Sequence, residues 1–288
     1  MTNDISINFI NLGIVIRNLG KSLNLFGFEI AYYGMIIALA MIVGIGVAVI
    51  FARKTGQDPN LYLDFAIYMV IFSIIGARLY YVIFEWKYYA ANPLEILNLR
   101  GGGLAIYGGI IAAVITCYVF ARIKKASFWK MVDTACLGLV VGQSIGRWGN
   151  FFNREAYGGF TDNLFAMQIK LEEAGGVVTQ ELRDKIVINN GVEYIQVHPT
   201  FLYESLWNIG VFILILLFRR FQKYDGEIFT WYVFGYALGR FWIEGLRTDQ
   251  LIAPVINLPV SQLLSALLAV AAAVFWIYKR NKLKKRTA

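Results

Sequence analysis

The sequence predicts an all-α integral membrane protein with seven transmembrane helices and a small extracytoplasmic head domain. Of its 288 residues, 58% are hydrophobic and only 16% are charged, and the mean hydropathy is +0.56. A soluble core of this size does not need such long apolar runs. Seven segments approach the ~20 residues that a bilayer requires: 29–51, 61–84, 103–121, 131–148, 200–218, 228–246 and 256–278.

The distribution of basic residues predicts the orientation, because loops rich in Lys and Arg stay in the cytoplasm. The N-terminus is therefore expected outside and the C-terminus inside. The net charge of +8 is mainly this topology signal, together with attraction to anionic lipids, and we expect no nucleic-acid partner. The cytoplasmic loops and tail carry Arg53, Lys54, Arg122, Lys124, Lys125, Lys130, Arg219, Arg220, Lys223, Lys279, Arg280, Lys282, Lys284, Lys285 and Arg286.

Five regions follow from this topology. An outer-face interfacial segment covers 1–28, with an interfacial helix expected over 5–27. Transmembrane helices 1–4 and a signature loop are expected in 29–159, followed by a head domain of short strands and a helix in 160–197. The last three spans lie in 198–278, and a basic cytoplasmic tail covers 279–288. No cleavable signal peptide is expected. Cys117 and Cys136 lie inside spans, which favours packed thiols over a disulfide or metal pair.

A polar stretch closes the fourth apolar run: Gly-Arg-Trp-Gly-Asn-Phe-Phe-Asn-Arg-Glu-Ala-Tyr-Gly, residues 146–158. Arg147, Asn150 and either Arg154 or Glu155 are spaced so that a helical continuation would gather several of them on one face. Two interpretations of Arg147 stay open at this point. It belongs to a functional site, or it pairs with a carboxylate that locks two helices together.

Further polar groups interrupt other spans. Arg78 is a functional candidate, because an unpaired charge in the hydrocarbon costs several kcal/mol, although it could also extend outward to the interface. The glycine-rich stretch 101–109 leaves amide groups free for an anion and presents the Tyr107 phenol. His198, the only histidine, is either a base or a structural residue. Tyr236, Arg240 and Glu244 are four residues apart and form one polar stripe.

Threading the seven spans up and down the membrane gathers most of these groups at one depth. Ten lie in the outer half of the bilayer: Tyr33, Arg78, Tyr107, Arg147, Asn150, Glu204, Tyr236, Arg240, Glu244 and Arg247. Only Asp64 and Asp133 lie toward the inner side, so a one-sided cavity fits better than a continuous ion pathway. With several arginines and few acids, this cavity is expected to bind an anion, and the planar Arg fork suits phosphate. The expected guest is a phospholipid headgroup.

The sequence resembles the prolipoprotein diacylglyceryl transferases of bacterial inner membranes over nearly its whole length. Segment 146–158 is similar to the family signature, and His198-Pro-Thr-Phe-Leu-Tyr-Glu204 and segment 236–247 support the resemblance. The resemblance implies a multi-pass enzyme whose site faces the outer leaflet. It would transfer the diacylglyceryl group of phosphatidylglycerol to the thiol of the lipobox cysteine in a preprolipoprotein signal peptide, releasing glycerol phosphate.

The resemblance also implies roles for individual residues. Arg147 and Arg240 would hold or activate the phosphate, while Asn150 and Glu155 would orient donors and the lipid glycerol. Gly108 and Gly158 match positions where a side chain would block substrate or strain a turn. The remaining matches are site tyrosines, acidic partners and a further arginine: Tyr33, Tyr236, Glu204, Glu244 and Arg247. No metal and no cofactor are implied.

Tyr107 departs from the family pattern, since the best-known members have a histidine before the paired glycines. A phenol with an ordinary pKa of ~10 is a poor base at neutral pH unless nearby arginines lower that pKa. Either Tyr107 is such a tuned phenol, or arginine electrostatics and leaving-group stabilisation provide most of the acceleration.

Two other classes of protein compete with this interpretation. A solute or lipid transporter would predict internal repeats and polar groups at every depth, and neither is found in the sequence. Another headgroup transferase would keep the arginines but usually requires paired carboxylates for a metal. Asp64 and Asp133 lie in separate spans and do not form such a pair.

Overall fold

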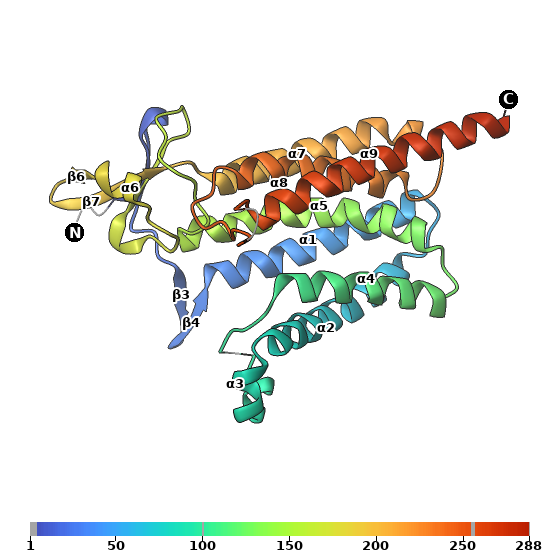
Figure 1. Ribbon diagram of the computed structural model, residues 1–288, viewed down its shortest axis with the longest axis horizontal. Helices are drawn as coiled ribbons and strands as arrows, with labels where there is room; N and C mark the ends of the chain where they lie inside the picture. The colour runs from blue at the N-terminus through green and yellow to red at the C-terminus, as the bar shows by residue number, and fades with distance from the viewer. Residues whose placement is uncertain (1–4, 100, 255–256, 288) are drawn as a thin grey trace. The chain divides into compact units, whose positions relative to one another are not determined.

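In the computed structural model of the chain (Figure 1), residues 5–99, 101–254 and 257–287 are described. They are mostly helical and form two compact units. The first unit consists of Met1–Gly44 and Gly138–Ala288, and the second of Ile45–Leu137. Helices α1 (Tyr32–Lys54) and α5 (Phe128–Asn153) each contribute residues to both units.

The first unit contains the helices that carry most of the expected site. Besides parts of α1 and α5, it has α7 (Thr200–Phe218), α8 (Glu227–Glu244) and α9 (Val260–Thr287), and α8 packs against both α7 and α9. The short 3-10 helix η4 (Arg219–Phe221) follows α7. Helices α1 and α5 approach closely, because a Cβ on Gly44 would lie only 2.8 Å from the carbonyl oxygen of Gly138.

An antiparallel sheet forms the other part of the first unit, with strand order β2-β1-β5-β7-β6. Its strands are β1 (Ile5–Phe9), β2 (Ile14–Arg17), β5 (Met167–Lys170), β6 (Val187–Asn189) and β7 (Val192–Val197). Pairing places Ile7 opposite Ile169 and Ile169 opposite Ile195, and all three side chains are fully buried. The 3-10 helices η1 (Ile10–Leu12) and η3 (Leu171–Glu173) and helix α6 (Gln180–Asp184) complete this part.

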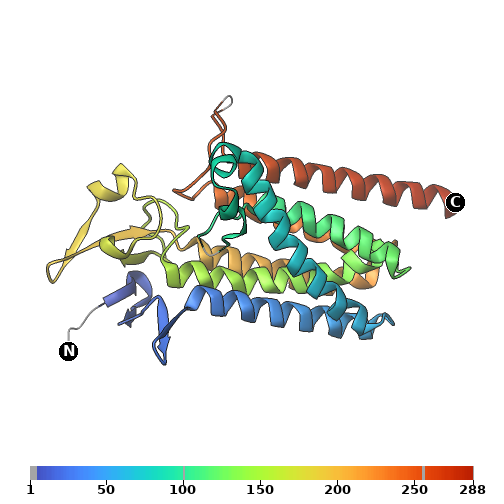
Figure 2. The same ribbon diagram turned by 90° about the horizontal axis from the view of Figure 1, so that it is seen from below.

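The interfacial helix expected over 5–27 is wrong, because this segment forms strands. Ile7 and Phe9 alternate with Ser6 and Asn8, which is the period of a strand, and both apolar side chains enter the core around Ile169. A second hairpin, β3 (Ser22–Leu25) with β4 (Phe28–Ala31), runs directly into α1 (Figure 2). The segment 5–31 therefore contributes two strands to the sheet that also uses residues 167–197.

The second unit contains α2 (Pro59–Phe84), α3 (Trp86–Ala91), η2 (Pro93–Leu97) and α4 (Ile106–Ile123). Helices α2 and α4 cross so closely that a Cβ on Gly108 would lie 2.4 Å from the carbonyl oxygen of Gly76. Phe65, Cys117 and Phe120 belong to one buried cluster there, while Cys136 is buried and, like Cys117, a free thiol.

Five of the described helices are long and apolar enough to cross a membrane: α1, α2, α4, Thr200–Phe221 (α7 with η4) and α9 through Lys285. Helices α5 and α8 also occupy predicted spans but carry more charge, such as Asp133 and Arg147 in α5 and Arg240 and Glu244 in α8. Crossing by all seven helices and the outside–inside orientation stay predictions. The predicted start of the last span, residue 256, lies outside the described residues.

Candidate functional site

One buried carboxylate joins two arginines in the first unit. Glu204, in the first turns of α7, is only 3% exposed. Its Oε2 lies 2.6 Å from Nη2 of Arg147 on α5, and its Oε1 accepts from Nη1 of Arg240 on α8 at 3.1 Å. Three helices therefore meet at a single side chain.

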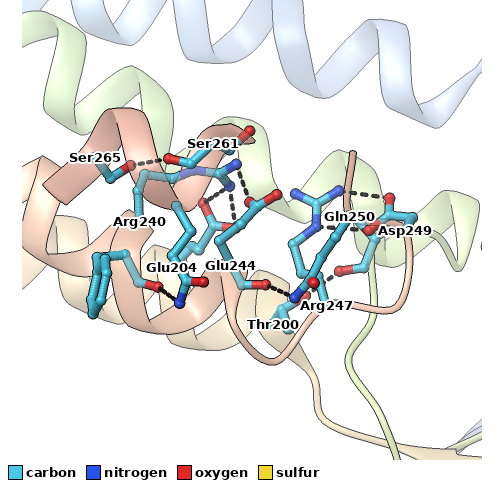
Figure 3. Close-up of polar contacts among 12 residues, drawn as sticks. Thr200, Glu204, Arg240, Glu244, Arg247, Asp249, Gln250, Ser261 and Ser265 are labelled. Carbon is cyan, nitrogen blue, oxygen red and sulfur yellow. Dashed lines mark hydrogen bonds and ion pairs between the residues drawn. The ribbon is translucent and has the colours of Figure 1, made fainter. Parts of the chain in front are cut away.

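A second carboxylate completes this cluster from within α8. Arg240 donates through Nη2 to Glu244, one helical turn later, and Glu244 is also buried (Figure 3). This contact follows the four-residue spacing seen in the sequence. We call Arg147, Glu204, Arg240 and Glu244 the arginine–glutamate cluster.

The charges of this cluster balance, with two guanidiniums and two carboxylates. The sequence predicted several arginines and few acids for the whole cavity, whereas within these four residues the two kinds of charge are equal in number. Balance follows from burial, because an unpaired charge removed from water is strongly destabilising. The ion pair predicted as one interpretation of Arg147 is present, but it leaves several N–H donors of this side chain available. A guanidinium has five N–H donors, and within the described residues Arg147 contacts a carboxylate through Nη2 alone.

Arg247 lies beyond the end of α8 and forms a bidentate pair with Asp249, with Nε–Oδ1 and Nη2–Oδ2 distances of 2.9 and 2.7 Å (Figure 3). Burial alone would lower the pKa of Arg247, but its bond to Asp249 and the charges of Glu244 and Glu204 raise the pKa above the ordinary value. The carboxylates of the arginine–glutamate cluster therefore stabilise the positive charge of Arg247.

The signature loop begins where α5 ends. Asn150 donates from Nδ2 to Oε1 of Glu155 at 2.8 Å, which fixes the orientation of both side chains. The backbone returns toward α5 through left-handed conformations at Arg154 (φ +53°) and Ala156 (φ +56°), which are uncommon for non-glycine residues. Arg154 is buried and pairs with Glu173 at 2.7 Å, so this arginine stabilises the sheet side of the loop.

Gly158 is the point where three distant segments touch. Its N–H donates to the carbonyl of His198, and it forms an isolated antiparallel bridge with Arg247. A Cβ on Gly158 would lie 2.7 Å from the Cβ of His198 and 2.8 Å from the carbonyl oxygen of Leu246. Glycine is needed here because neighbouring backbones approach closely, and this contact brings the signature loop to the segment of Arg247.

The two predicted site tyrosines of this unit lie on different helices. The ring of Tyr33, at the start of α1, packs against Gly149, the residue before Asn150. A Cβ on Gly149 would lie only 2.8 Å from this ring. Tyr236, one turn before Arg240, stacks on Tyr232 with ring centroids 5.8 Å apart. Tyr236 also lines a small pocket with Glu204, Trp207, Asn208, Gly239, Arg240 and Ile243.

Several residues around the cluster were missed in the sequence. Ser144 and Ser205 are buried and lie 3.0 Å apart through their hydroxyls, and the Trp148 indole donates to Ser205 at 3.2 Å. These contacts bind α5 to α7 next to the Arg147–Glu204 pair. Asn208 is also buried. Its position four residues after Glu204 was the available signal, because that spacing repeats a helix face.

His198 has structural contacts. Its backbone exchanges hydrogen bonds with Gly158 and Gly159, and its Nδ1 lies 3.3 Å from the Tyr203 hydroxyl. Burial lowers the pKa of the imidazole, which favours the neutral ring.

The remaining predicted residues belong to the second unit. Arg78 is buried, and its guanidinium donates to five backbone carbonyls, those of Glu95, Ile96, Asn98, Gly102 and Gly103. This arginine therefore holds the loop before α4. Tyr107 lies in the first turn of α4 and is partly buried, and Gly108 lies at the close crossing with α2.

These features define a class: a multi-helix membrane protein whose helices share a buried, charge-balanced arginine–glutamate cluster. The family model described as prolipoprotein diacylglyceryl transferase matches residues 21–278. The chain belongs to this family.

Curated relatives agree with the family match. The chain is 41% identical over 259 residues to the phosphatidylglycerol–prolipoprotein diacylglyceryl transferase of Clostridioides difficile, covering 90% of this chain and 95% of the relative. The proteins of the same name from Listeria welshimeri and Finegoldia magna are 44% and 42% identical, covering 88% and 91% of this chain and 87% and 96% of theirs.

Proposed function

We propose that this protein transfers the diacylglyceryl group of phosphatidylglycerol to the thiol of the lipobox cysteine in preprolipoproteins. A C–S bond forms at the glyceryl carbon while its C–O bond to phosphate breaks, and the bonding electrons leave with the phosphate oxygen. The thiol proton passes to the departing phosphate or to water, so the products are a thioether and glycerol phosphate. This is a transferase reaction of lipoprotein biosynthesis.

The shared binding of Arg147 and Arg240 to Glu204 is the observation that carries the mechanism. Two guanidiniums that reach one carboxylate, at 2.6 and 3.1 Å, are also near enough to share one phosphate of similar size. Their unused N–H donors stabilise negative charge where it develops on the leaving phosphate. Glu204 and Glu244 act as the acidic partners that hold the arginines in place.

The other site residues are assigned from the family resemblance and from the contacts within each unit. Asn150 and Glu155, bound to each other at 2.8 Å, orient the lipid glycerol and its donors. Tyr33 and Tyr236 border the lipid, Gly158 preserves the junction that carries Arg247, and Gly108 allows the helix crossing next to Tyr107. Arginine electrostatics and leaving-group stabilisation provide most of the acceleration, while Tyr107 assists through its phenol.

We further propose a membrane location and an orientation for the protein. The protein lies in the bacterial cytoplasmic membrane as a seven-span protein with its site facing the outer leaflet. Phosphatidylglycerol enters from the bilayer, and the signal peptide presents its lipobox cysteine near the outer surface. The basic loops predicted on the cytoplasmic side support this orientation.

The direct test uses purified protein, phosphatidylglycerol and a synthetic lipobox peptide. Mass spectrometry is expected to detect a diacylglyceryl adduct on the peptide cysteine. A peptide with Ser in place of that cysteine, and a reaction with phosphatidylethanolamine as the only lipid, serve as controls. Absence of the adduct, under conditions in which a relative forms it, would reject the proposed function.

A further inference from the structure

The signature loop holds the backbone of Arg247 through residues 157–159. Arg247 forms an isolated antiparallel bridge with this segment. Its chain neighbours add two hydrogen bonds to the same segment, one accepted by the carbonyl of Leu246 at 3.0 Å and one donated by the N–H of Thr248 at 3.3 Å. The backbone of Arg247 is therefore fixed on both sides along the chain.

Asp249 fixes the guanidinium of the same residue. Its carboxylate accepts from Nε and Nη2 of Arg247 at 2.9 and 2.7 Å, and two parallel bonds of this kind define the plane of the guanidinium. The next residue, Gln250, donates to the backbone carbonyl of Glu244 and so ties the turn that presents Asp249 to the end of α8 (Figure 3). Backbone and side chain of Arg247 are thus both held in place.

One part of this guanidinium stays available. Within the described parts of the chain, the hydrogen bonds and the ion pair of the Arg247 side chain use Nε and Nη2, and Nη1 makes none. Figure 3 shows the guanidinium with Asp249 on one side and Glu244 of the arginine–glutamate cluster on the other. The charges of Glu244 and Glu204 help to raise the pKa of Arg247, which agrees with this placement. Because Asp249 occupies the edge formed by Nε and Nη2, Nη1 lies on the side of the cluster.

Asp249 neutralises its arginine less completely than the two glutamates neutralise theirs. Its side chain is 29% exposed, against 4% for Glu204 and 5% for Glu244. Water screens an exposed charge far more than a buried one. Arg247 therefore retains attraction for an incoming anion, although it is already paired.

A guanidinium that is oriented before its ligand arrives binds more tightly, because its rotamer freedom has already been lost. We propose that Asp249 is a positioning residue, which holds Arg247 as a third cation for the phosphate that Arg147 and Arg240 bind. The inference rests on the proposed function. A guanidinium that contacts the phosphate both in the bound lipid and in the transition state changes KM more than kcat, so Asp249 is expected to act on affinity for the lipid donor.

The first test measures transfer from phosphatidylglycerol to the lipobox peptide by Asp249→Ala. KM for the lipid is expected to rise about tenfold, as for the loss of one hydrogen bond to a charged group, while kcat changes less than about threefold. Asp249→Asn keeps the size of the side chain but has one acceptor oxygen in place of two. It should change KM in the same direction, and it replaces the alanine variant if that variant does not fold. A KM that is unchanged or lower would overturn the inference.

A double-mutant cycle with Arg247→Ala separates positioning from a purely structural role. The cycle is measured as the Kd for phosphatidylglycerol in detergent without peptide, so that it does not depend on turnover. If Asp249 acts through the guanidinium, adding Asp249→Ala to Arg247→Ala should leave Kd unchanged. A further rise in Kd in the double variant, as large as that caused by Asp249→Ala alone, would overturn the inference.

Glu181→Ala is the matched control. It removes the carboxylate of an exposed ion pair on α6, 3.2 Å from Lys185, and should leave KM and Kd unchanged. A normal KM in Asp249→Ala, with adduct formation intact, rejects the role of Asp249 alone. Absence of the adduct with the unmodified protein would instead reject the transferase function itself.

Discussion

Arg147 and Arg240 are bound to the same carboxylate, that of Glu204, although they lie on helices α5 and α8. The carboxylate holds the two guanidiniums near each other before any lipid arrives. Because the three side chains are largely buried, the contact fixes the arrangement of three helices as well as that of the two charges.

Glu204→Gln should reveal this double role. Removing one partner of a buried ion pair costs about 3–5 kcal/mol, so thermal unfolding in detergent should occur at a clearly lower temperature, with transfer strongly reduced. The matched control is Asp64→Asn, which breaks the exposed pair with Lys124. Exposed pairs contribute about 0–1 kcal/mol, so this variant should behave like the unmodified protein. Equal stability of the two variants would contradict the proposal that Glu204 holds Arg147 and Arg240 in place.

Arg147→Lys and Arg240→Lys keep the positive charge but lose the planar fork. Removing a donor that stabilises transition-state charge costs about 10²–10³ in kcat, and we expect a loss of that size for each variant. Steady-state kinetics with the lipobox peptide measure it. Arg17→Lys, at an exposed position, is the control and should leave kcat unchanged. A lysine variant with normal kcat would remove that arginine from the proposed mechanism.

Tyr107→Phe separates the two interpretations of the phenol. If arginine electrostatics dominate, the variant should lose less than about tenfold in kcat, well below the effect expected for the arginines. A loss of about 10²–10⁴ in kcat with an unchanged unfolding temperature would identify the phenol as the proton acceptor.

Gly158→Ala tests the junction of the three segments. The new Cβ would meet both the Cβ of His198 and the carbonyl of Leu246, so the backbones must separate, at a cost of about 1–3 kcal/mol. The unfolding temperature and the rate of transfer should therefore both decrease. Gly159→Ala is a closely matched control, because no heavy atom lies within 4 Å of its added Cβ. Similar behaviour of the two variants would argue against close approach as the reason for Gly158.

His198 should affect stability at acidic pH rather than catalysis. Burial lowers the pKa of its imidazole, while the unfolded chain takes up the proton near the ordinary value of about 6.5. The unfolded state therefore binds more protons as the pH falls below that value, and the folded state loses stability. His198→Gln should keep its activity and show a smaller decrease in unfolding temperature between pH 7 and 5. Loss of transfer in this variant at pH 7 would instead favour the base interpretation.

The helices could be predicted from the sequence because long apolar runs reflect a bilayer's thickness directly. The strands at the N-terminus were missed, since their alternation is short and one partner of β1 lies more than a hundred residues later, as Ile7 opposite Ile169 shows. Spacing predicted the Arg240–Glu244 contact within one helix. It could not predict the contact of Arg147 with Glu204, because the rotation of α5 against α7 is set by packing, including the Ser144–Ser205 hydrogen bond.

The equal numbers of guanidiniums and carboxylates in the arginine–glutamate cluster bear on turnover. At rest the cluster is electroneutral and needs no counterion. A phosphodiester adds one negative charge on arrival, whereas the glycerol phosphate left after the reaction is a monoester that carries about −1.5 to −2 near neutral pH. In the proposed reaction the product therefore carries more negative charge than the incoming lipid and no acyl chains, and hydration of this small anion favours its escape into water.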